Sequence, residues 1–402
     1  MSKLSYLEKL LDGVEVEWLP LGNVTKYKQP TKYLVKAKDY HDTFSIPVLT
    51  AGKTFILGYT DETHGIYEAS KTPVIIFDDF TTASKWVDFD FKAKSSAMKM
   101  ITSSDDIRFS LKYVYYWLNT LPSELVDGDH KRQWISNYAQ KKVPVPCPAN
   151  PEKSLAIQAE IVRILDKFTE LTAELTAELT LRKKQYNYYR DKLLSFEECE
   201  VEWKTLDEVA SFRRGSFPQP YGNSEWYNGE GCMPFVQVAD VADFGFRLHR
   251  STKQQISKLA QSKSVFVEAG TVIVSLQGTI GRVALTQYDC YVDRTLAIFT
   301  KYKAAVNKKY FAHQLKAKFD LEKEFARGST LKTITKEEFS KFQIPIPPLE
   351  VQNRIVALLD KFDRLTHSIE EGLPRELELR QKQYEYYREL LFSFPKLEAA
   401  SN

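Results

Sequence analysis

The chain has 402 residues, with a hydrophobic content of 43%, an aromatic content of 13% and a formal net charge of +3 at pH 7. This composition excludes an intrinsically disordered chain and allows two or three domains with cores of their own. Four scattered cysteines without a CxxC pair indicate neither a zinc site nor a disulfide framework and favour a reducing cytosol, and no apolar run approaches the ~18 residues of a membrane helix.

The first part of the chain predicts a helical fragment followed by a mixed, mostly β domain. Residues 1–13 contain KLSYLEKLLD, which is similar to the YYRDKLLSF that ends a long helix further on. Residues 14–150 open with VEVEW, contain strand-like segments such as PVIIFDD and KWVDFDF, and include one helix, LKYVYYWLNTL at 111–121. The domain ends in VPVPCP at 143–148, which we interpret as a stiff connector because proline disfavours helix.

Residues 151–198 predict a long helix that is repeated near the end of the chain. The first copy runs from Ile157 to Phe196 and the second from Val351 to Phe394, and both contain LDKF and a KQYxYYR motif. Apolar residues step by three or four, which is the spacing of a coiled coil. About 38 helical residues span roughly 57 Å, too long for one globular domain. The simplest partner for each copy is therefore the other copy.

Residues 199–348 predict a second domain that begins and ends like the first but differs from it in the sequence between. Its opening CEVEWKTLDEV, its helix at 307–322 and its IPIPPL at 344–349 match the first domain, whereas the segments between them share little sequence. FVEAGTVIVSLQGTIGRVAL at 266–285 predicts a hairpin with two glycines at its turn. The second helical region, 349–402, carries an extra Glu-Gly-Leu-Pro that predicts a kink or local break.

The predicted fold class is α+β. Two mixed α/β domains are separated by two long repeated helices that form an antiparallel coiled coil, with an internal pseudo-twofold repeat.

No pattern in the sequence is typical of a catalytic centre or a metal site. LTAGKT ends like a phosphate-binding loop, but Pro47 stands where that motif needs glycine, and strand-like residues follow. The pairs Asp78-Asp79 and Asp105-Asp106 have no histidine at a useful spacing and are interpreted as turn or capping residues. Neither a metal-binding histidine pattern nor an amino-methyltransferase tetrapeptide is present. We predict no catalytic residue, no metal and no cofactor in this chain.

Basic residues interleaved with aromatic ones occur several times in both domains. One such cluster is usually a solvated face, but several of them favour phosphate contacts. On the predicted tight turn, glutamine can read adenine and arginine can read guanine. The candidate DNA contacts, chosen by residue type and placement, are Lys26, Lys28, Lys53, Lys85, Arg132, Arg213, Arg214, Gln277, Thr279, Arg282 and Arg294. The candidate contacts with the partner helix or another subunit are Phe168, Tyr186, Tyr189, Phe362, Tyr384 and Tyr387.

With these features the chain resembles the specificity (S) subunits of type I restriction-modification systems. The likeness covers essentially the whole chain. It rests on the duplicated EIVRILDKF…RKKQYNYYRDKLL and RIVALLDKF…RQKQYEYYRELL blocks, on VEWxxL at 16–21 and 201–206, on IPIPPLEVQ, and on GTIGRV at 278–283. TAELTAEL at 172–179 resembles the IC subgroup in particular.

The resemblance implies that each domain would be a target-recognition domain for one half of an asymmetric bipartite site in double-stranded DNA. The helices would set the spacer and dock two methyltransferase (M) subunits, which bind S-adenosylmethionine and methylate adenine. Restriction (R) subunits, which use ATP and Mg, would join for cleavage. The chain itself would be non-catalytic and would work in the bacterial cytoplasm, bound to DNA and not to a membrane.

Two alternatives remain at this stage. The first is a coiled-coil scaffold that joins two β-rich modules for carbohydrate or protein, which a salt-sensitive affinity for DNA would distinguish. The second is an enzyme with a cryptic site, which would need a perturbed catalytic group that the sequence does not display.

Overall fold

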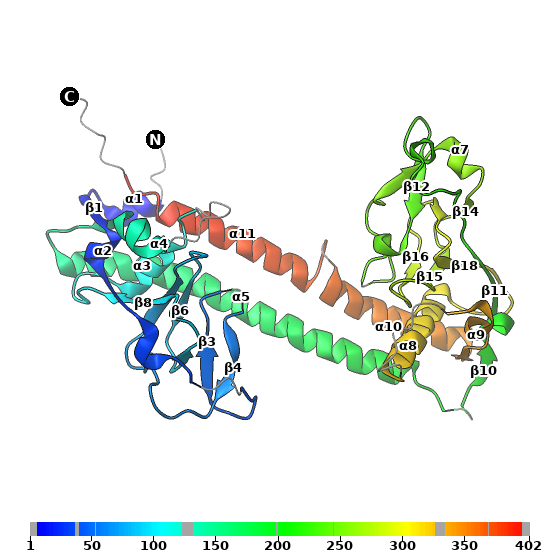
Figure 1. The fold of residues 1–402 in the computed structure, drawn as a ribbon, viewed down its shortest axis with the longest axis horizontal. Coiled ribbons are helices and arrows are strands. Elements are labelled where there is room, and N and C mark those ends of the chain that lie inside the picture. Colours follow the sequence, from blue (N-terminus) through cyan, green and yellow to red (C-terminus); the bar gives the residue numbers. More distant parts are fainter. Residues whose placement is uncertain are drawn as a thin grey trace. The chain divides into compact units, whose positions relative to one another are not determined.

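The computed structural model describes residues 6–36, 40–52, 54–122, 132–197, 200–243, 245–325, 334–368 and 370–395. The chain divides into two compact units (Figure 1): unit 1 joins Met1–Ala173 to Leu379–Asn402, and unit 2 is Glu174–Glu378. Each unit holds one sheet-rich domain together with segments of both long helices. The predicted α+β class, with a long helix between two sheet-rich domains, is confirmed.

The first long helix is continuous and the second is broken. Helix α5, Pro151–Leu194, has 44 residues and begins at a proline, which fits the first helical turn because its missing N–H has no partner there in any case. The second copy forms α10, Leu349–His367, and α11, Leu373–Leu391. Gly372 precedes α11 with φ +80°, and a Cβ there would lie 2.4 Å from the carbonyl oxygen of Arg364. The predicted break is confirmed.

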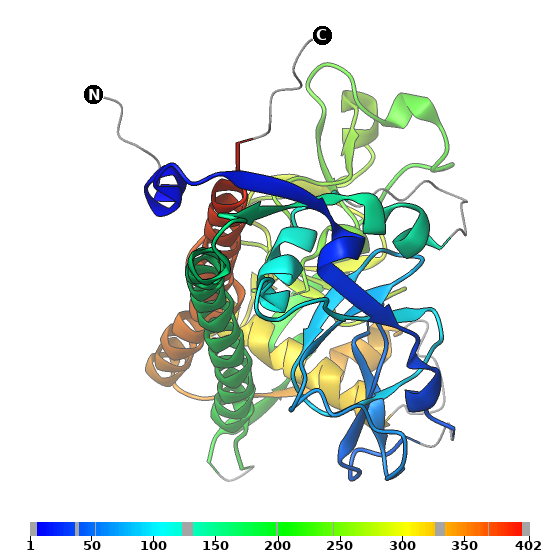
Figure 2. The same ribbon diagram turned by 90° about the vertical axis from the view of Figure 1, so that its left-hand side faces the viewer.

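The domain of unit 1 contains two larger sheets, besides a two-stranded sheet described below. In Figure 2 the segments of α5 (green) and α11 (red) run side by side, with the domain (blue to cyan) against them. The strands of the main sheet, in spatial order, are β2 Thr25–Lys28, β8 Met98–Ser103, β5 Val74–Asp78 and β6 Ser84–Val87. Those of the second sheet are β4 Ile56–Thr60, β3 Ile46–Leu49 and β7 Lys92–Ala93. The helices are α1 Tyr6–Leu11, α2 Leu21–Val24, α3 Leu111–Leu118 and α4 Gln133–Ser136, with 3₁₀ turns η1 Pro30–Tyr33 and η2 Tyr138–Gln140.

Unit 2 is built in the same way. The strands of its main sheet, in spatial order, are β11 Ala210–Arg214, β18 Leu296–Tyr302, β15 Val272–Ser275 and β16 Val283–Leu285. Those of its second sheet are β13 Gln254–Ile256, β12 Met233–Val236, β17 Cys290–Val292 and β14 Val265–Val267. The helices are α6 Leu206–Val209, α7 Lys258–Gln261, α8 Lys308–Phe325 and α9 Lys336–Ser340, with 3₁₀ turns η3 Ser224–Trp226 and η4 Val238–Asp240.

The two domains share a topology that their sequences do not show. The order β2-β8-β5-β6 in unit 1 corresponds to β11-β18-β15-β16 in unit 2, strand for strand along the chain. In the second sheets, β3 pairs with β4 antiparallel and β7 parallel, and β12 pairs likewise with β13 and β17. The two domains therefore differ in sequence but share the order of the main sheet and three strands of the second sheet, to which unit 2 adds β14.

The proline-spaced stretches are extended and lead into the long helices, as predicted, but they are also paired strands, which the sequence did not indicate. β9, Lys142–Pro146, pairs antiparallel with β1, Val16–Pro20, and β19, Gln343–Ile346, pairs with β10, Glu202–Thr205. Each sheet has only two strands, and proline is tolerated on such edges because an outward N–H is not needed. The pairing brings the start and the end of each domain side by side.

Buried hydrogen bonds join each domain helix to the two-stranded sheet at the base of its domain, in the same way in both units. The hydroxyl of Tyr113 on α3 donates to the carbonyl oxygen of Pro144 at 2.8 Å, and Tyr310 on α8 donates to Pro345 at 3.0 Å. Both tyrosines are buried, and burial raises the pKa of each phenol, so both hydroxyls remain donors.

A glutamine on each long helix makes the second duplicated contact. Gln158 and Gln352 are 1% and 0% exposed. Gln158 accepts a hydrogen bond from the backbone N–H of Ser110, and Gln352 accepts one from Asn307, both at 2.8 Å. Because a buried amide left without partners costs about 1–3 kcal/mol, these contacts fix the domain on its helix within each unit.

Candidate nucleic-acid interface

One end of the main sheet in unit 2 gathers four chain segments. β11 and β15 end there, and β16 and β18 begin there, since Arg214 pairs with Ala297 and Ser275 pairs with Leu296. We call residues 213–214, 276–282 and 293–295 the unit 2 sheet end. It contains every DNA contact predicted for the second domain, namely Arg213, Arg214, Gln277, Thr279, Arg282 and Arg294. The structure therefore brings together residues that the sequence placed on separate segments.

The turn 276–282 between β15 and β16 is tightly held. The hydroxyl of buried Ser275 donates to the carbonyl oxygen of Thr279 at 2.6 Å and accepts from the backbone N–H of Arg282 at 2.9 Å. The guanidinium of Arg282 donates to the carbonyl oxygen of Val241 at 2.9 Å and forms an ion pair with Asp243 at 2.7 Å. Arg282 thus ties the turn to the preceding loop, and its contact with guanine stays a prediction.

Two glycines with left-handed backbones give the turn its shape. The φ angles of Gly278 and Gly281 are +71° and +76°, which L side chains rarely adopt. A Cβ at Gly281 would lie 2.6 Å from the Cβ of Phe319, whereas one at Gly278 would meet nothing within 4 Å. The predicted hairpin with these glycines at its turn is confirmed. Gly278 leaves open space beside the exposed Thr279.

The segment before β18 is fixed by a buried carboxylate. Asp293 is 2% exposed and accepts hydrogen bonds from the Tyr221 hydroxyl and the Thr295 hydroxyl, each at 2.5 Å. Burial and the bond to Asp293 raise the pKa of Tyr221, so its hydroxyl stays protonated. The guanidinium of Arg294 lies 5.3 Å from the centre of the Tyr221 ring. Arg294 is exposed on a rigid support.

The corresponding end of the unit 1 sheet collects three of the five contacts predicted for the first domain. Lys28 and Lys85 stand in one cross-strand row, through Met100 and Ile76. Arg132 joins them, because the next residue, Gln133, donates its backbone N–H to the carbonyl oxygen of Asp79 at 2.9 Å. We call residues 28, 79–85 and 132–134 the unit 1 sheet end.

The other two predicted contacts of the first domain lie elsewhere or cannot be placed. Lys26 is exposed two residues earlier on β2, where its ammonium donates to the carbonyl oxygen of Ser104 at 3.0 Å. Lys53 lies outside the described residues. Within the predicted carboxylate pairs, Asp78 and Asp105 do shape turns, since the carboxylate of Asp78 accepts from the backbone N–H of Phe80 at 2.9 Å and that of Asp105 from Ile107 at 3.0 Å. Asp79 instead is fully buried beside Lys99.

Four of the predicted interface aromatics form two equivalent stacked pairs, in each of which the tyrosine stays partly exposed. In unit 1 the rings of Phe168 and Tyr387 are stacked at 5.3 Å, and in unit 2 those of Tyr189 and Phe362 are stacked at 5.8 Å. Tyr186 is 8% exposed in the unit 2 core. Tyr384 is partly buried against the unit 1 core. Contact of these residues with another subunit stays a prediction.

The sequence-based selection missed the neighbouring tyrosines, which point outward. Tyr188 is 60% exposed and Tyr386 is 62% exposed. Each forms an edge-to-face pair with the next tyrosine, at 5.3 Å and 75° in both units. A helical projection of the KQYxYYR motif could have separated them from the inward tyrosines, because residues two apart do not share a helix face.

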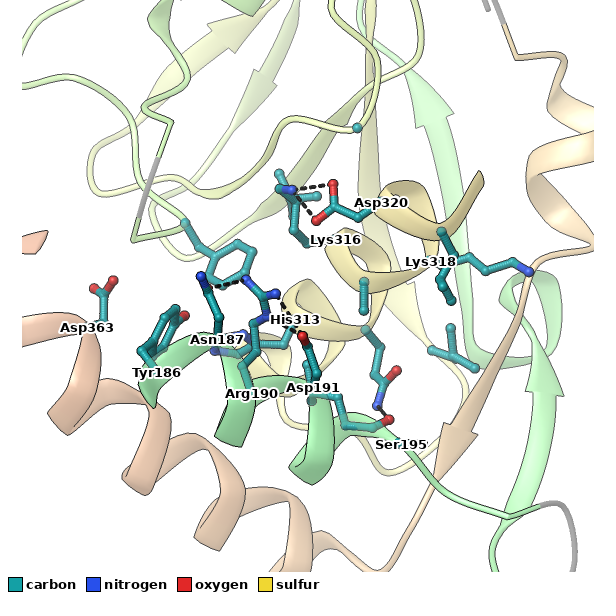
Figure 3. Close-up of a pocket in the computed structure, with 18 of the residues that line it drawn as sticks. Tyr186, Asn187, Arg190, Asp191, Ser195, His313, Lys316, Lys318, Asp320 and Asp363 are labelled. Atoms are coloured by element: carbon teal, nitrogen blue, oxygen red, sulfur yellow. Dashed lines mark hydrogen bonds and ion pairs between the residues drawn. The ribbon is translucent and has the colours of Figure 1, made fainter. Parts of the chain in front are cut away.

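Unit 2 also contains a cavity of about 920 Å³ (Figure 3). Figure 3 shows Tyr186, Asn187 and Arg190 on one side of it and His313 with Lys316 on α8. Two pairs of its charged groups form ion pairs, Lys316 with Asp320 and Arg190 with Asp191. Across the described parts of the chain, no three histidine, cysteine or acidic side chains are grouped to hold a metal ion, and no helix is long and apolar enough to span a membrane.

The cavity marks a difference between the two units. Three residues after the equivalent tyrosines of α3 and α8, unit 1 has Tyr116, whose hydroxyl donates to Asp166 at 2.5 Å, and unit 2 has His313. His313 is 3% exposed, its Nδ1 has no hydrogen-bond partner among the described residues, and the ring of Phe246 covers it at 4.4 Å. Burial lowers the pKa of His313 to about 3. The imidazole is therefore neutral.

Comparison with known proteins assigns the family. A family model described as the type I restriction modification DNA specificity domain matches residues 199–379. Sequence similarity extends over the whole chain, which belongs to the specificity subunits of type I restriction-modification systems. The chain is 60% identical to the EcoR124I/EcoR124II specificity subunit of Escherichia coli over 100% of both proteins. It is 33% identical to the EcoprrI specificity subunit of Escherichia coli, over 92% of this chain and 93% of that protein.

Solved structures agree with the fold. The S subunit from M. genitalium superposes with a TM-score of 0.58 at 16% identity, over 96% of this chain and 98% of that chain. A chain from work on complex assembly and conformational transition of the type I R-M system gives a TM-score of 0.57 at 19% identity, over 94% and 97%. The relation to the IC subgroup stays a prediction.

The buried imidazole makes unit 2 sensitive to acid. An exposed histidine has a pKa near 6.5, so below that pH the unfolded chain binds a proton that folded His313 does not bind, and stability falls as pH falls. Between pH 7.5 and 5.5 we expect a loss of about 1 kcal/mol from this group. Urea unfolding of His313→Gln should lack that loss, while Tyr116→Phe in unit 1 should keep it. Equal pH dependence in the wild type and His313→Gln would contradict the assignment.

Proposed function

We propose that this specificity subunit reads an asymmetric, bipartite DNA site, one half with each sheet end. The observation that carries the proposal is the shared topology. The same end of the same sheet bears cations in both units, but the side chains differ, with Lys28, Lys85 and Arg132 in unit 1 and arginines with Gln277 and Thr279 in unit 2. Two sheet ends with the same topology but different side chains suit two different half-sites.

The exposed cations and the polar turn have separate tasks in this proposal. Lysine and arginine contacts with phosphates give affinity and register, while hydrogen bonds to base edges give sequence preference. Arg213 on β11 and Arg294 just before β18 would contact phosphates beside the unit 2 turn. Gln277 and Thr279 would reach base edges in the major groove, where glutamine can bond adenine through two hydrogen bonds.

The outward tyrosines support a proposal about the partners. Tyr188 and Tyr386 occupy equivalent positions of the repeated motif and have the same ring geometry and exposure. Two equivalent surfaces suit two copies of one partner, and we propose that each binds one M subunit. The M subunits would supply S-adenosylmethionine and methyl transfer, and R subunits with ATP and Mg would join for cleavage. The chain itself would be non-catalytic and would act in the cytoplasm.

The function is tested by expressing the chain with the M subunits encoded beside it. We expect a stable complex and, by methylome sequencing of the host, a methylated adenine in an asymmetric motif with an unread central gap. A complex without such a motif would contradict half-site reading. A chain that binds no M subunit would contradict the docking proposal.

Single tyrosine variants should remove one M subunit each. Because exposed aromatic anchors often dominate an interface, Tyr188→Ala should weaken one M site by about tenfold or more and Tyr386→Ala the other. Mass photometry should then show complexes with one M subunit for each variant and none for the double variant. Leu259→Ala, a half-exposed position on α7, serves as the control and should keep two. Two M subunits on the double variant would refute these surfaces.

The length of α5 should set the spacer of the DNA site. The boundary between the units falls inside the Thr-Ala-Glu-Leu run, within the continuous helix. One more such unit adds four residues, or ~6 Å of helix, against ~3.4 Å for each base pair of DNA. We expect the methylated motif of the insertion variant to gain one or two base pairs in its gap. Thr180→Ala, which keeps the helix length, should leave the gap unchanged. An unaltered gap in the insertion variant would disprove the relation.

A further inference from the structure

The segment that joins β5 and β6 in unit 1 takes the place of the 276–282 turn in unit 2. In both main sheets the turn connects the third strand of the spatial order to the fourth. In both, a residue that follows the domain helix donates its backbone N–H to the start of the turn, Gln133 to Asp79 at 2.9 Å and Ile334 to Leu276 at 3.2 Å. The two turns are therefore equivalent, although their sequences are unrelated.

The unit 1 turn is formed by a carboxylate where the unit 2 turn uses glycines. The carboxylate of Asp78 accepts hydrogen bonds from the backbone N–H groups of Phe80 at 2.9 Å and Thr81 at 3.0 Å. The N–H of Thr82 donates to the carbonyl oxygen of Asp78 at 2.9 Å, and Thr82 has a φ of +59°. These bonds close the turn and direct residues 80 and 81 to the surface.

A buried ion pair fixes the base of the turn. Asp79 is 0% exposed, and its carboxylate accepts from the backbone N–H of Trp134 at 2.8 Å. The ammonium of Lys99, which is 1% exposed, lies 3.2 Å from the same carboxylate. Two charges buried together hold this end of the turn in one arrangement, because separating them would leave an unpaired buried charge. The turn presents its outer side chains on a rigid support.

One of the exposed side chains of the turn is aromatic. Phe80 is 40% exposed and belongs to the unit 1 sheet end, which also contains the cations Lys85 and Arg132. A single exposed phenylalanine means little by itself. Here it stands where unit 2 presents Gln277 and Thr279, and a phenyl ring has one specific partner on a base edge in the major groove, the C5-methyl group of thymine.

We infer that the β5–β6 turn is the base-reading element of the first domain and that Phe80 selects an A·T pair by contact with the thymine methyl group. The inference rests on the proposed function, since it concerns the half-site that unit 1 reads. It assigns a specificity-determining residue to a turn in which the sequence pattern indicated only structural carboxylates.

The test uses the chain in complex with its M subunits and begins with the motif of the wild type from methylome sequencing. Binding is then measured by fluorescence anisotropy on duplexes in which each thymine of both half-sites is replaced in turn by uracil, which lacks the methyl group. We expect one position in the first half-site where this replacement weakens wild-type binding about fourfold, the equivalent of one buried methyl group. Phe80→Ala should bind the thymine duplex and the uracil duplex of that position with equal affinity. Phe80→Leu should retain part of the difference in affinity between them.

The matched control is Ile107→Ala. Ile107 is 75% exposed and follows the opposite end of β8, so its removal should leave the uracil effect unchanged. A uracil effect that persists in Phe80→Ala, or one that Phe80→Ala changes only in the second half-site, would overturn the inference while leaving bipartite reading intact. A wild-type complex without a bipartite motif would overturn the proposed function and the inference with it. Thermal unfolding checks that each variant is folded.

Discussion

One buried polar side chain is repeated at the attachment of each domain to its long helix. Gln158 in unit 1 and Gln352 in unit 2 each use both ends of the amide. The oxygen accepts from the N–H of the residue that precedes the domain helix, α3 or α8, and the nitrogen donates to a carbonyl two residues earlier. An amide with all its bonds made inside the protein tolerates little displacement. The contact is repeated, so two domains of unlike sequence are held on equivalent supports, and their surfaces are free to differ.

The long helices and the domain helices could be predicted from the sequence because their sequences are repeated. LDKF and KQYxYYR identify the helices, and the extra Glu-Gly-Leu-Pro identifies the break that the structure shows between His367 and Leu373. The helices at 111–121 and 307–322 were found from a few matched residues, and they proved to be the same element. The two copies keep the same residues in these segments because each buries one face against an element that is itself repeated.

The rest could not be predicted, for physical reasons. Strand pairing joins residues far apart in the chain, so nothing near Pro144 or Pro345 reveals that each faces a tryptophan on a neighbouring strand. The common topology of the two domains depends on which residues are buried, and many sequences satisfy one burial pattern. The partners of Arg282 are also non-local, and an exposed phenylalanine such as Phe80 carries no sequence signal. The predicted cations at the sheet ends were found by type and by their closeness to turns, and their contacts with DNA stay predictions.

The two-stranded base of each domain makes the domain an exchangeable cassette. Val16 faces Pro146 and Glu202 faces Ile346, so the chain leaves and rejoins the helical frame at neighbouring points. A segment with its ends in register can be replaced by a longer, shorter or unrelated one without moving the helices. Recombination within the coding sequence at these two places would therefore change what the molecule recognises in a single event and leave its assembly untouched. A gene built in this way can acquire new specificities faster than point mutation of individual contacts would allow.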